Sequence, residues 1–158
     1  YSSTITNLGV LDPYVANTDG FFSASADPAS PWREQHFGTA DNTGIAADSC
    51  DADGDGSTNA EEYICGTDPN QPDAFNPLEQ TYADGTATLK FLARQSAGAG
   101  FTGLTRHYRL QSTGNLEGQT EWTSVAGNSD ILGEDQIISI GVPVTGGKRF
   151  YRLQTWLQ

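Results

Sequence analysis

One segment, Asp51–Glu62, limits what this chain can fold into more than any other. It reads Asp-Ala-Asp-Gly-Asp-Gly-Ser-Thr-Asn-Ala-Glu-Glu, with carboxylates at its first, third, fifth and twelfth positions. A chain with this spacing coils around a hard cation, which takes about six to eight oxygen ligands at about 2.3–2.6 Å. Gly56 at the sixth position permits the sharp turn that such a loop contains.

The loop predicts a Ca²⁺ site in preference to a solvated acidic turn, because its carboxylates, glycine and closing glutamate all stand where the cation requires them. Mg²⁺ fits less well, since it retains several waters and this loop offers many carboxylates. We also expect Asn59 to cap the following helix with Glu62 completing a capping box, and Gly66 to end that helix. The predicted ligands are Asp51, Asp53, Asp55, the Ser57 carbonyl, Asn59 and Glu62.

Charge is distributed unevenly along the 158 residues, whose net charge is −12. Residues 1–84 hold fifteen acidic residues and one base, Arg33, whereas residues 85–158 hold five acidic residues and seven bases. This asymmetry indicates two modules with different roles. The acidic balance disfavours nucleic acid as a partner. The longest uncharged apolar run, residues 137–144, is far shorter than the roughly 20 residues of a membrane-spanning helix, so we expect no membrane span.

From Thr86 onward, apolar and polar residues alternate with a period of two. Such runs, separated by Gly, Asn and Asp, are typical of an antiparallel β-sandwich of the Ig-like or jelly-roll type. We therefore expect a mainly β protein that also carries a small helical, EF-hand-like module. The five strand candidates centre on residues 89–93, 108–110, 122–125, 138–142 and 151–153.

These patterns divide the chain into three segments. Residues 31–73 form the calcium module, which opens with a short helix from Pro31 to Phe37 that Gly38 ends. Residues 74–158 form the β-sandwich. Residues 1–30 are extended in character and hold one candidate strand, residues 4–11, whose apolar side chains are Ile5, Leu8, Val10 and Leu11.

The stretches Trp32–Gly38, Asp51–Tyr63 and Gly66–Pro69 together resemble the calcium module found near the ends of many large secreted bacterial proteins. That module is similar to a single dockerin or EF-hand loop, or to thrombospondin type-3 repeats. In such proteins it is often followed by a small Ig-like or fibronectin-like β-domain. The resemblance covers about residues 31–69 and implies a secreted or cell-surface bacterial protein. Dockerins carry two loops and this chain has one, so the resemblance does not extend to their docking partners.

The two cysteines, Cys50 and Cys65, flank the loop. We expect a disulfide between them, which would close a ring of about 15 residues and contribute roughly 3 kcal/mol. Two free thiols or a redox pair are the alternatives. The even number of cysteines and the absence of Met favour a processed chain exported to an oxidising compartment.

No enzyme motif occurs in the chain, and its only histidines, His36 and His107, stand in no catalytic pattern. We therefore expect a protein without enzymatic activity.

A near-repeat, Arg106–Gln111 and Arg149–Gln154, offers a cationic face if the two strands pair. Arg109 and Arg152 would then contact glycans or an acidic partner, although a solvated sheet face explains them as well. Three tryptophans allow a sugar platform or core packing: Trp32, Trp122 and Trp156.

Five strands leave a sandwich with an exposed edge, and such edges accept further strands. The leading hypothesis is a Ca²⁺-stabilised extracellular structural subunit. Its copies would assemble head to tail into a fibre, each donating the strand at residues 4–11 to the next. The alternative is a monomeric module of a larger secreted bacterial protein that binds glycans or a surface partner.

Overall fold

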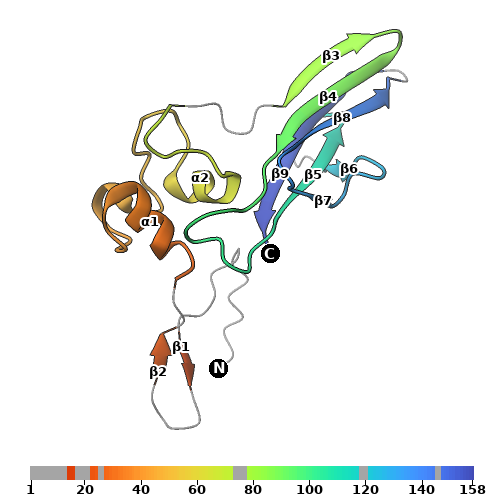
Figure 1. The fold of residues 1–158 in the computed structure, drawn as a ribbon. Coiled ribbons are helices and arrows are strands. Elements are labelled where there is room, and N and C mark those ends of the chain that lie inside the picture. The colour runs from red at the N-terminus through yellow and green to blue at the C-terminus, as the bar shows by residue number, and fades with distance from the viewer. Residues whose placement is uncertain (1–13, 17–21, 25–26, 73–77, 118–120, 145–146) are drawn as a thin grey trace.

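The computed structural model describes residues 14–16, 22–24, 27–72, 78–117, 121–144 and 147–158. The protein is mostly β, with antiparallel sheets and two short α-helices, as the sequence predicts. Figure 1 shows the helices lying together on one side of the molecule and the larger sheets on the other, with a small hairpin projecting from the helical side. That hairpin consists of β1 (Tyr14–Ala16) and β2 (Phe22–Ala24).

The helical side contains α1 (Ser30–Phe37), a 3₁₀ turn η1 (Gly44–Ala46) and α2 (Asn59–Cys65). The first helix forms where the sequence predicts it, with Pro31 in its first turn and a left-handed Gly38 at its end. A left-handed Gly66 likewise ends α2, also as predicted.

The predicted cap of α2 is wrong by one residue. Thr58, and not Asn59, is the N-cap: its hydroxyl accepts a hydrogen bond from the Glu61 amide, and the Glu61 carboxylate accepts one from the Thr58 amide at 2.8 Å. Asn59 lies inside the helix because its side chain is engaged elsewhere, donating to the carbonyls of Ile45 and Ala47.

Two antiparallel sheets make up the β-domain. In one, β4 (Thr86–Ala93) lies between β3 (Glu79–Ala83) and β8 (Gln136–Pro143). In the other, β5 (Arg106–Thr113) pairs with β9 (Phe150–Leu157) along one edge, and with β6 (Thr123–Ser124) and β7 (Ile131–Leu132) along the other. All five predicted strands are present. The sequence did not predict β3 and β7.

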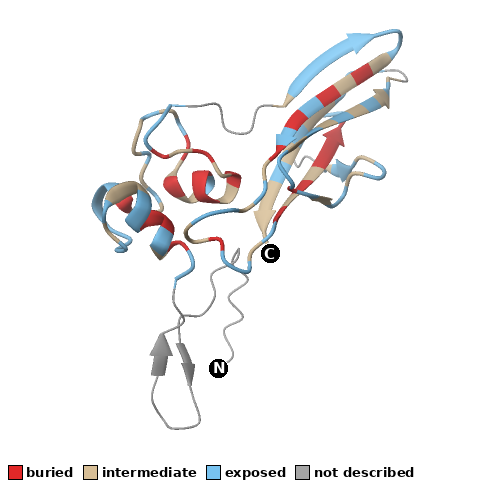
Figure 2. Ribbon diagram, viewed as in Figure 1, coloured by how far each residue is buried: buried red, intermediate tan, exposed pale blue. Residues whose placement is uncertain are grey.

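The two sheets enclose one hydrophobic cluster. Its buried centre is Phe91 and Ala93 of β4 with Tyr108 of β5, and partly buried side chains of both sheets pack around it. Figure 2 shows buried positions alternating along β4, as expected for a strand with one face on the core. The partly buried members are Leu78, Ile131, Ile138, Ile140 and Leu153.

A second cluster joins the helices to the β-domain. Trp32 of α1 and Tyr63 of α2 meet edge to face at 5.5 Å between ring centroids, and Tyr63 stacks on Phe101 at 4.7 Å. Leu104 and Leu157 from the β-domain pack against the same cluster. The helical module and the β-domain therefore share a core.

The candidate donor strand, residues 4–11, lies outside the residues that the structure describes. Among those it does describe, no helix has the length and hydrophobicity to span a membrane.

Candidate metal centre

The loop brings three carboxylates together. One oxygen from each of Asp51, Asp53 and Asp55 lies within 4.8 Å of the other two. Asp51 shapes the turn, because its two oxygens accept hydrogen bonds from the amides of Gly54 at 2.7 Å and Gly56 at 3.0 Å. Both glycines have positive φ, 80° and 101°, which residues with a Cβ rarely adopt.

These residues fit a hard cation. The Asp53 Oδ2 atom is buried and has no hydrogen-bond partner among the described residues, which is costly unless a ligand satisfies it. Three carboxylates at this separation also repel one another in the absence of positive charge. Arg33 is the only base in residues 1–84, and its guanidinium is bound elsewhere. A divalent cation with oxygen ligands, such as Ca²⁺, would supply positive charge at this cluster.

Two further predicted ligands lie at the exit of the loop. Ser57 is buried, and Glu62 is fully buried in the first turn of α2, where its Oε1 accepts a hydrogen bond from the Thr67 hydroxyl at 3.3 Å. Glu62 does not belong to the group of three carboxylates that share the 4.8 Å limit. The structure places Glu62 outside this group, on the helix that leaves the loop.

Asn59 has a bracing role that the sequence did not indicate. Its fully buried side chain donates hydrogen bonds of 2.8 Å to the carbonyls of Ile45 and Ala47, and its amide donates one of 2.8 Å to the Cys50 carbonyl. These bonds fix the exit of the loop against its entrance.

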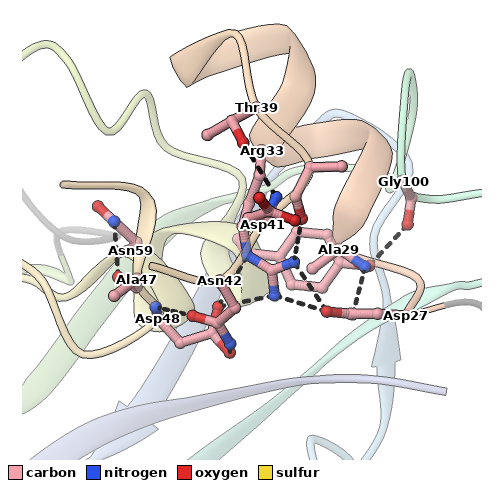
Figure 3. Close-up of polar contacts among 12 residues, drawn as sticks. Asp27, Ala29, Arg33, Thr39, Asp41, Asn42, Ala47, Asp48, Asn59 and Gly100 are labelled. Carbon is pink, nitrogen blue, oxygen red and sulfur yellow. Dashed lines mark hydrogen bonds and ion pairs between the residues drawn. The ribbon is translucent and has the colours of Figure 1, made fainter. Parts of the chain in front are cut away.

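A buried arginine anchors the entrance of the loop to α1 (Figure 3). The Arg33 guanidinium donates to Asp27 Oδ2 at 2.7 Å and to Asp48 Oδ1 at 3.0 Å, while Asn42 donates to the other oxygen of Asp48 at 2.7 Å. Burial alone would lower the pKa of Arg33, but the bonds to the two carboxylates raise it. The sequence held a signal for this role, because Arg33 is the single base among many acidic residues in the first half of the chain.

A second buried arginine holds α2 against the β-domain. Arg106 at the start of β5 is 2% exposed, and its guanidinium donates to the carbonyls of Ile64 at 2.6 Å, Gln95 at 2.7 Å and Tyr63 at 3.3 Å. Two of these carbonyls belong to the last turn of α2, where carbonyls lack partners within the helix. Burial lowers the pKa of Arg106.

The placement of Arg106 corrects the predicted cationic face. The two near-repeat strands do pair, but the register sets Arg106 opposite Leu157, on the core side of the sheet. Gly66 accommodates it, because a Cβ there would lie 2.5 Å from Arg106 Nη1. The period-two pattern of the strand was the available signal, because it puts Arg106 on the face of Tyr108 and Leu110 and Arg109 on the other face.

Arg109 and Arg152 lie on the outer face of the β5–β9 pair. Each stacks on a tryptophan: Arg109 lies 5.1 Å from the ring centroid of Trp156, and Arg152 lies 4.4 Å from that of Trp122. Arg152 also donates to Gln111 at 2.8 Å. The third tryptophan, Trp32, belongs to the core instead.

The predicted disulfide is absent: both cysteines are free thiols. Cys65 faces β9 from the last turn of α2, where it is 1% exposed and hydrogen-bonds with Thr155. Burial raises its pKa to about 11. Cys65 therefore contributes to the contact between helix and sheet and does not clamp the loop.

Each histidine pairs with an aspartate. His36 lies 3.4 Å from Asp68, and His107 lies 2.6 Å from Asp130 and 2.8 Å from the Thr105 hydroxyl. This second group has the order of a nucleophile, base and orienting acid. However, the amides of Thr105 and Gln158 bond to each other's carbonyls, so neither is free to stabilise an oxyanion. The group is better explained as a brace between strands.

Comparisons of the chain with protein-family models, curated proteins and solved structures find no significant match.

Proposed function

We propose that this protein is a non-enzymatic extracellular structural subunit, in which a Ca²⁺-binding module is fixed to an Ig-like β-sandwich. The proposal rests on the way in which the two ends of α2 are held. The helix begins inside the acidic loop with Glu62 in its first turn, and it ends on the Arg106 guanidinium of β5. An ion bound in the loop would thus stabilise the contact between the two modules.

The Ca²⁺ ion would be held by the three clustered carboxylates, Glu62 and the Ser57 carbonyl, with Asn59 at the ninth position of the loop. When bound, it neutralises the carboxylates and gives the buried Asp53 oxygen a partner. The protein's own residues do the rest: Arg33 fixes the loop entrance, Asn59 its exit, and Arg106 the end of the outgoing helix.

A structural role accounts for this design better than catalysis does. Buried polar groups in the helical module hold backbone in place. The proposed setting is the exterior or surface of a bacterium, where millimolar Ca²⁺ would load even a weak site. Copies would associate head to tail, with residues 4–11 of one chain adding a strand to the next.

Electron microscopy of the purified full chain in negative stain tests this proposal. Filaments in Ca²⁺ that disappear in excess chelator would establish a subunit whose metal module takes part in assembly. Compact monomers in both conditions would contradict it.

The outer face of the β5–β9 pair favours one second candidate, a module that binds glycans. Trp122 and Trp156 lie there beside Arg152 and Arg109, and aromatic rings next to charged donors suit acidic sugars. Screening on a glycan array tests this candidate. Binding should be lost in Trp156→Ala and kept in Tyr82→Ala, an exposed aromatic residue of the other sheet. A chain that binds no glycan would exclude it.

A further inference from the structure

The two fully buried arginines of this protein differ in how their charge is balanced. Arg33 is 1% exposed and forms ion pairs with Asp27 and Asp48. Arg106 is 2% exposed, but its three hydrogen bonds go to backbone carbonyls, which carry no net charge. Among the residues that the structure describes, no carboxylate forms an ion pair with it. A buried charge without a counter-ion is costly.

A second arginine without a counter-ion acts on the first. Arg94 directly follows β4 and is half-buried, and its guanidinium has no hydrogen-bond or ion-pair partner within the described part of the chain. Burial is the main cause that lowers the pKa of Arg106, and the positive charge of Arg94 lowers it further. The two guanidinium groups therefore repel each other, and an anion that contacts both would relieve this repulsion.

Both arginines line one cavity, at the junction of the helical side and the β-domain. The cavity has a volume of about 380 Å³ and is partly open to solvent, with walls from α1, the end of α2 and the loop that follows β4. The nearly buried rings of Trp32 and Phe101 belong to these walls, and the Arg106 guanidinium lies 5.1 Å from the ring centroid of Phe101. None of the predicted Ca²⁺ ligands lines this cavity.

Two aspartates also line the cavity, and their carboxylates are engaged elsewhere. Asp68 Oδ1 lies 3.4 Å from His36 Nδ1 and accepts a hydrogen bond from the Asn70 amide at 3.1 Å. Asp135 accepts a hydrogen bond from the Gln95 amide at 2.9 Å. Neither aspartate forms an ion pair with the arginines, but both would repel a ligand that carries more than one negative charge.

We propose that this cavity binds a small organic monocarboxylate. The carboxylate would lie on the guanidinium groups of Arg94 and Arg106, which match its planar shape and can donate paired hydrogen bonds to it. The apolar part of the ligand would lie against the rings of Trp32 and Phe101. A cavity of this size suits a small molecule that combines an apolar part with a few polar contacts. The site goes beyond the proposed function and depends neither on the metal loop nor on self-association.

Titration of the full chain in Ca²⁺ with acetate, benzoate and sulfate, followed by NMR at constant ionic strength, tests the proposal. The Nε–H signal of Arg106 reports on the cavity, because its hydrogen bond to the Ile64 carbonyl holds the guanidinium in place. Acetate should shift this signal until it saturates. Benzoate should bind about tenfold more tightly, because its ring would contact Trp32 and Phe101. Sulfate should bind more weakly than acetate, because it carries two charges.

Arg94→Gln provides the matched test. It should weaken benzoate binding by about tenfold or more, because a charged hydrogen-bond donor is lost. It should not lower the urea midpoint of the free protein, because it also removes a charge that repels Arg106. A second variant, Arg94→Lys, keeps the charge but lacks the planar group, and it should also bind benzoate more weakly than the wild type. The control is Arg149→Gln, an exposed arginine outside the cavity, which should bind benzoate as the wild type does.

Several results would overturn the site. One is the absence of a saturable shift of the Arg106 signal with either carboxylate. Others are equal benzoate binding by the wild type and both Arg94 variants, or equal weakening in Arg149→Gln. Sulfate that binds more tightly than acetate would contradict a site for a monocarboxylate, and benzoate that binds no more tightly than acetate would contradict contact with the two rings.

Discussion

The two parts of this protein are stabilised by different forces. In the β-domain, the side chains of Phe91, Tyr108 and Leu110 are removed from water between two sheets, so burial of apolar surface dominates. In the helical module, the largest buried side chains at the loop are polar: Arg33, Asn59 and Glu62. Such a module depends on hydrogen bonds and on neutralised charge. Under the proposed function, this difference would make the helical module, and not the β-domain, dependent on a bound ion.

The contact between the two parts should make the β-domain share the dependence of the helical module on neutralised charge. Arg106 belongs to the apolar domain, yet it donates its hydrogen bonds to the end of α2. The buried carbonyls that it satisfies would be costly to leave unpaired. Loss of the ion should therefore weaken the β-domain at this contact. In a variant that lacks Arg106, the stability of the β-domain should no longer depend on the ion.

The largest effect should follow removal of the ion. The variant Asp51→Asn with Asp53→Asn deletes two ligand charges, so Ca²⁺ should no longer raise the free energy of unfolding. In the wild type the gain should reach about 4 kcal/mol when free Ca²⁺ exceeds Kd about a thousandfold. Calorimetric melting with and without Ca²⁺ measures it. The control, Glu34→Gln with Asp41→Asn, makes the same charge change at exposed sites outside the loop and should keep the gain.

Breaking the contact itself comes next. Arg106→Met removes three hydrogen bonds that a buried charged side chain donates, and it should lower the free energy of unfolding by about 3 kcal/mol. Urea denaturation measures this loss. Arg149→Met is the control, because Arg149 is exposed and donates to the Ser112 hydroxyl at 3.3 Å, and its effect should stay below about 0.5 kcal/mol. Equal effects in the two variants would mean that Arg106 does not hold the modules together.

Two glycines with nearly the same backbone angle provide a matched test of the contact with Arg106. Gly66 has φ 73° and Gly85 has φ 74°, but only Gly66 lies against Arg106. Gly85→Ala should cost about 1 kcal/mol for the left-handed conformation alone. Gly66→Ala should cost about 2 kcal/mol more, because its Cβ would displace the guanidinium. Chemical denaturation of both variants compares the two costs, and equal losses would contradict the close contact.

High pH should act on the helical side of the contact. Burial raises the pKa of Cys65 from 9.0 to about 11 and that of Tyr63 from 10.0 to about 12. Both neutral forms are thus favoured by folding, so this stability is complete below pH 9; the contribution of Cys65 is lost as the pH rises from 9 to about 11, and that of Tyr63 as it rises from 10 to about 12.

The loss attributable to Cys65 should be on the order of 2 kcal/mol. Unfolding measured across this range should show a smaller loss in Cys65→Ser, which does not titrate. Cys50→Ser serves as the matched control and should behave as the wild type does. A wild-type stability that stays constant to pH 11 would refute the burial of the Cys65 thiol.

The smallest effect concerns the start of α2. Thr58→Ala removes the N-cap hydroxyl and should lower stability by about 1 kcal/mol. Thr43 precedes η1 without making a side-chain cap, so Thr43→Ala should have almost no effect. Thermal melts in Ca²⁺ decide between the two, and an unchanged Thr58→Ala would restore Asn59 as the cap.

The loop and the strands were predictable because their signals are local. Carboxylate spacing around a cation and alternation along β4 involve residues close in the sequence. The position of β3 was not predictable in this way. All five of its residues are exposed, so the strand has no buried face that would impose an alternating apolar pattern.

Long-range contacts explain the two errors of side-chain placement. Strand alternation places Arg106 on the same face as Tyr108 and Leu110, but it does not reveal what pairs the guanidinium there, because its partners on α2 lie 42 and 43 residues earlier in the chain. Flanking positions suggested that Cys50 and Cys65 pair, but packing of α2 on β9 turns Cys65 toward Thr155. Both outcomes depend on how the module docks, which no local pattern encodes.

Hydrogen exchange of the wild-type chain with Ca²⁺ and with chelator tests the central claim most directly. Ca²⁺ should slow exchange in the loop and α2, and also at Arg106 and Tyr108 on β5, while leaving the amides of β8 unchanged. Slower exchange confined to residues 50–62, or none at all, would contradict an ion-stabilised contact between the two modules.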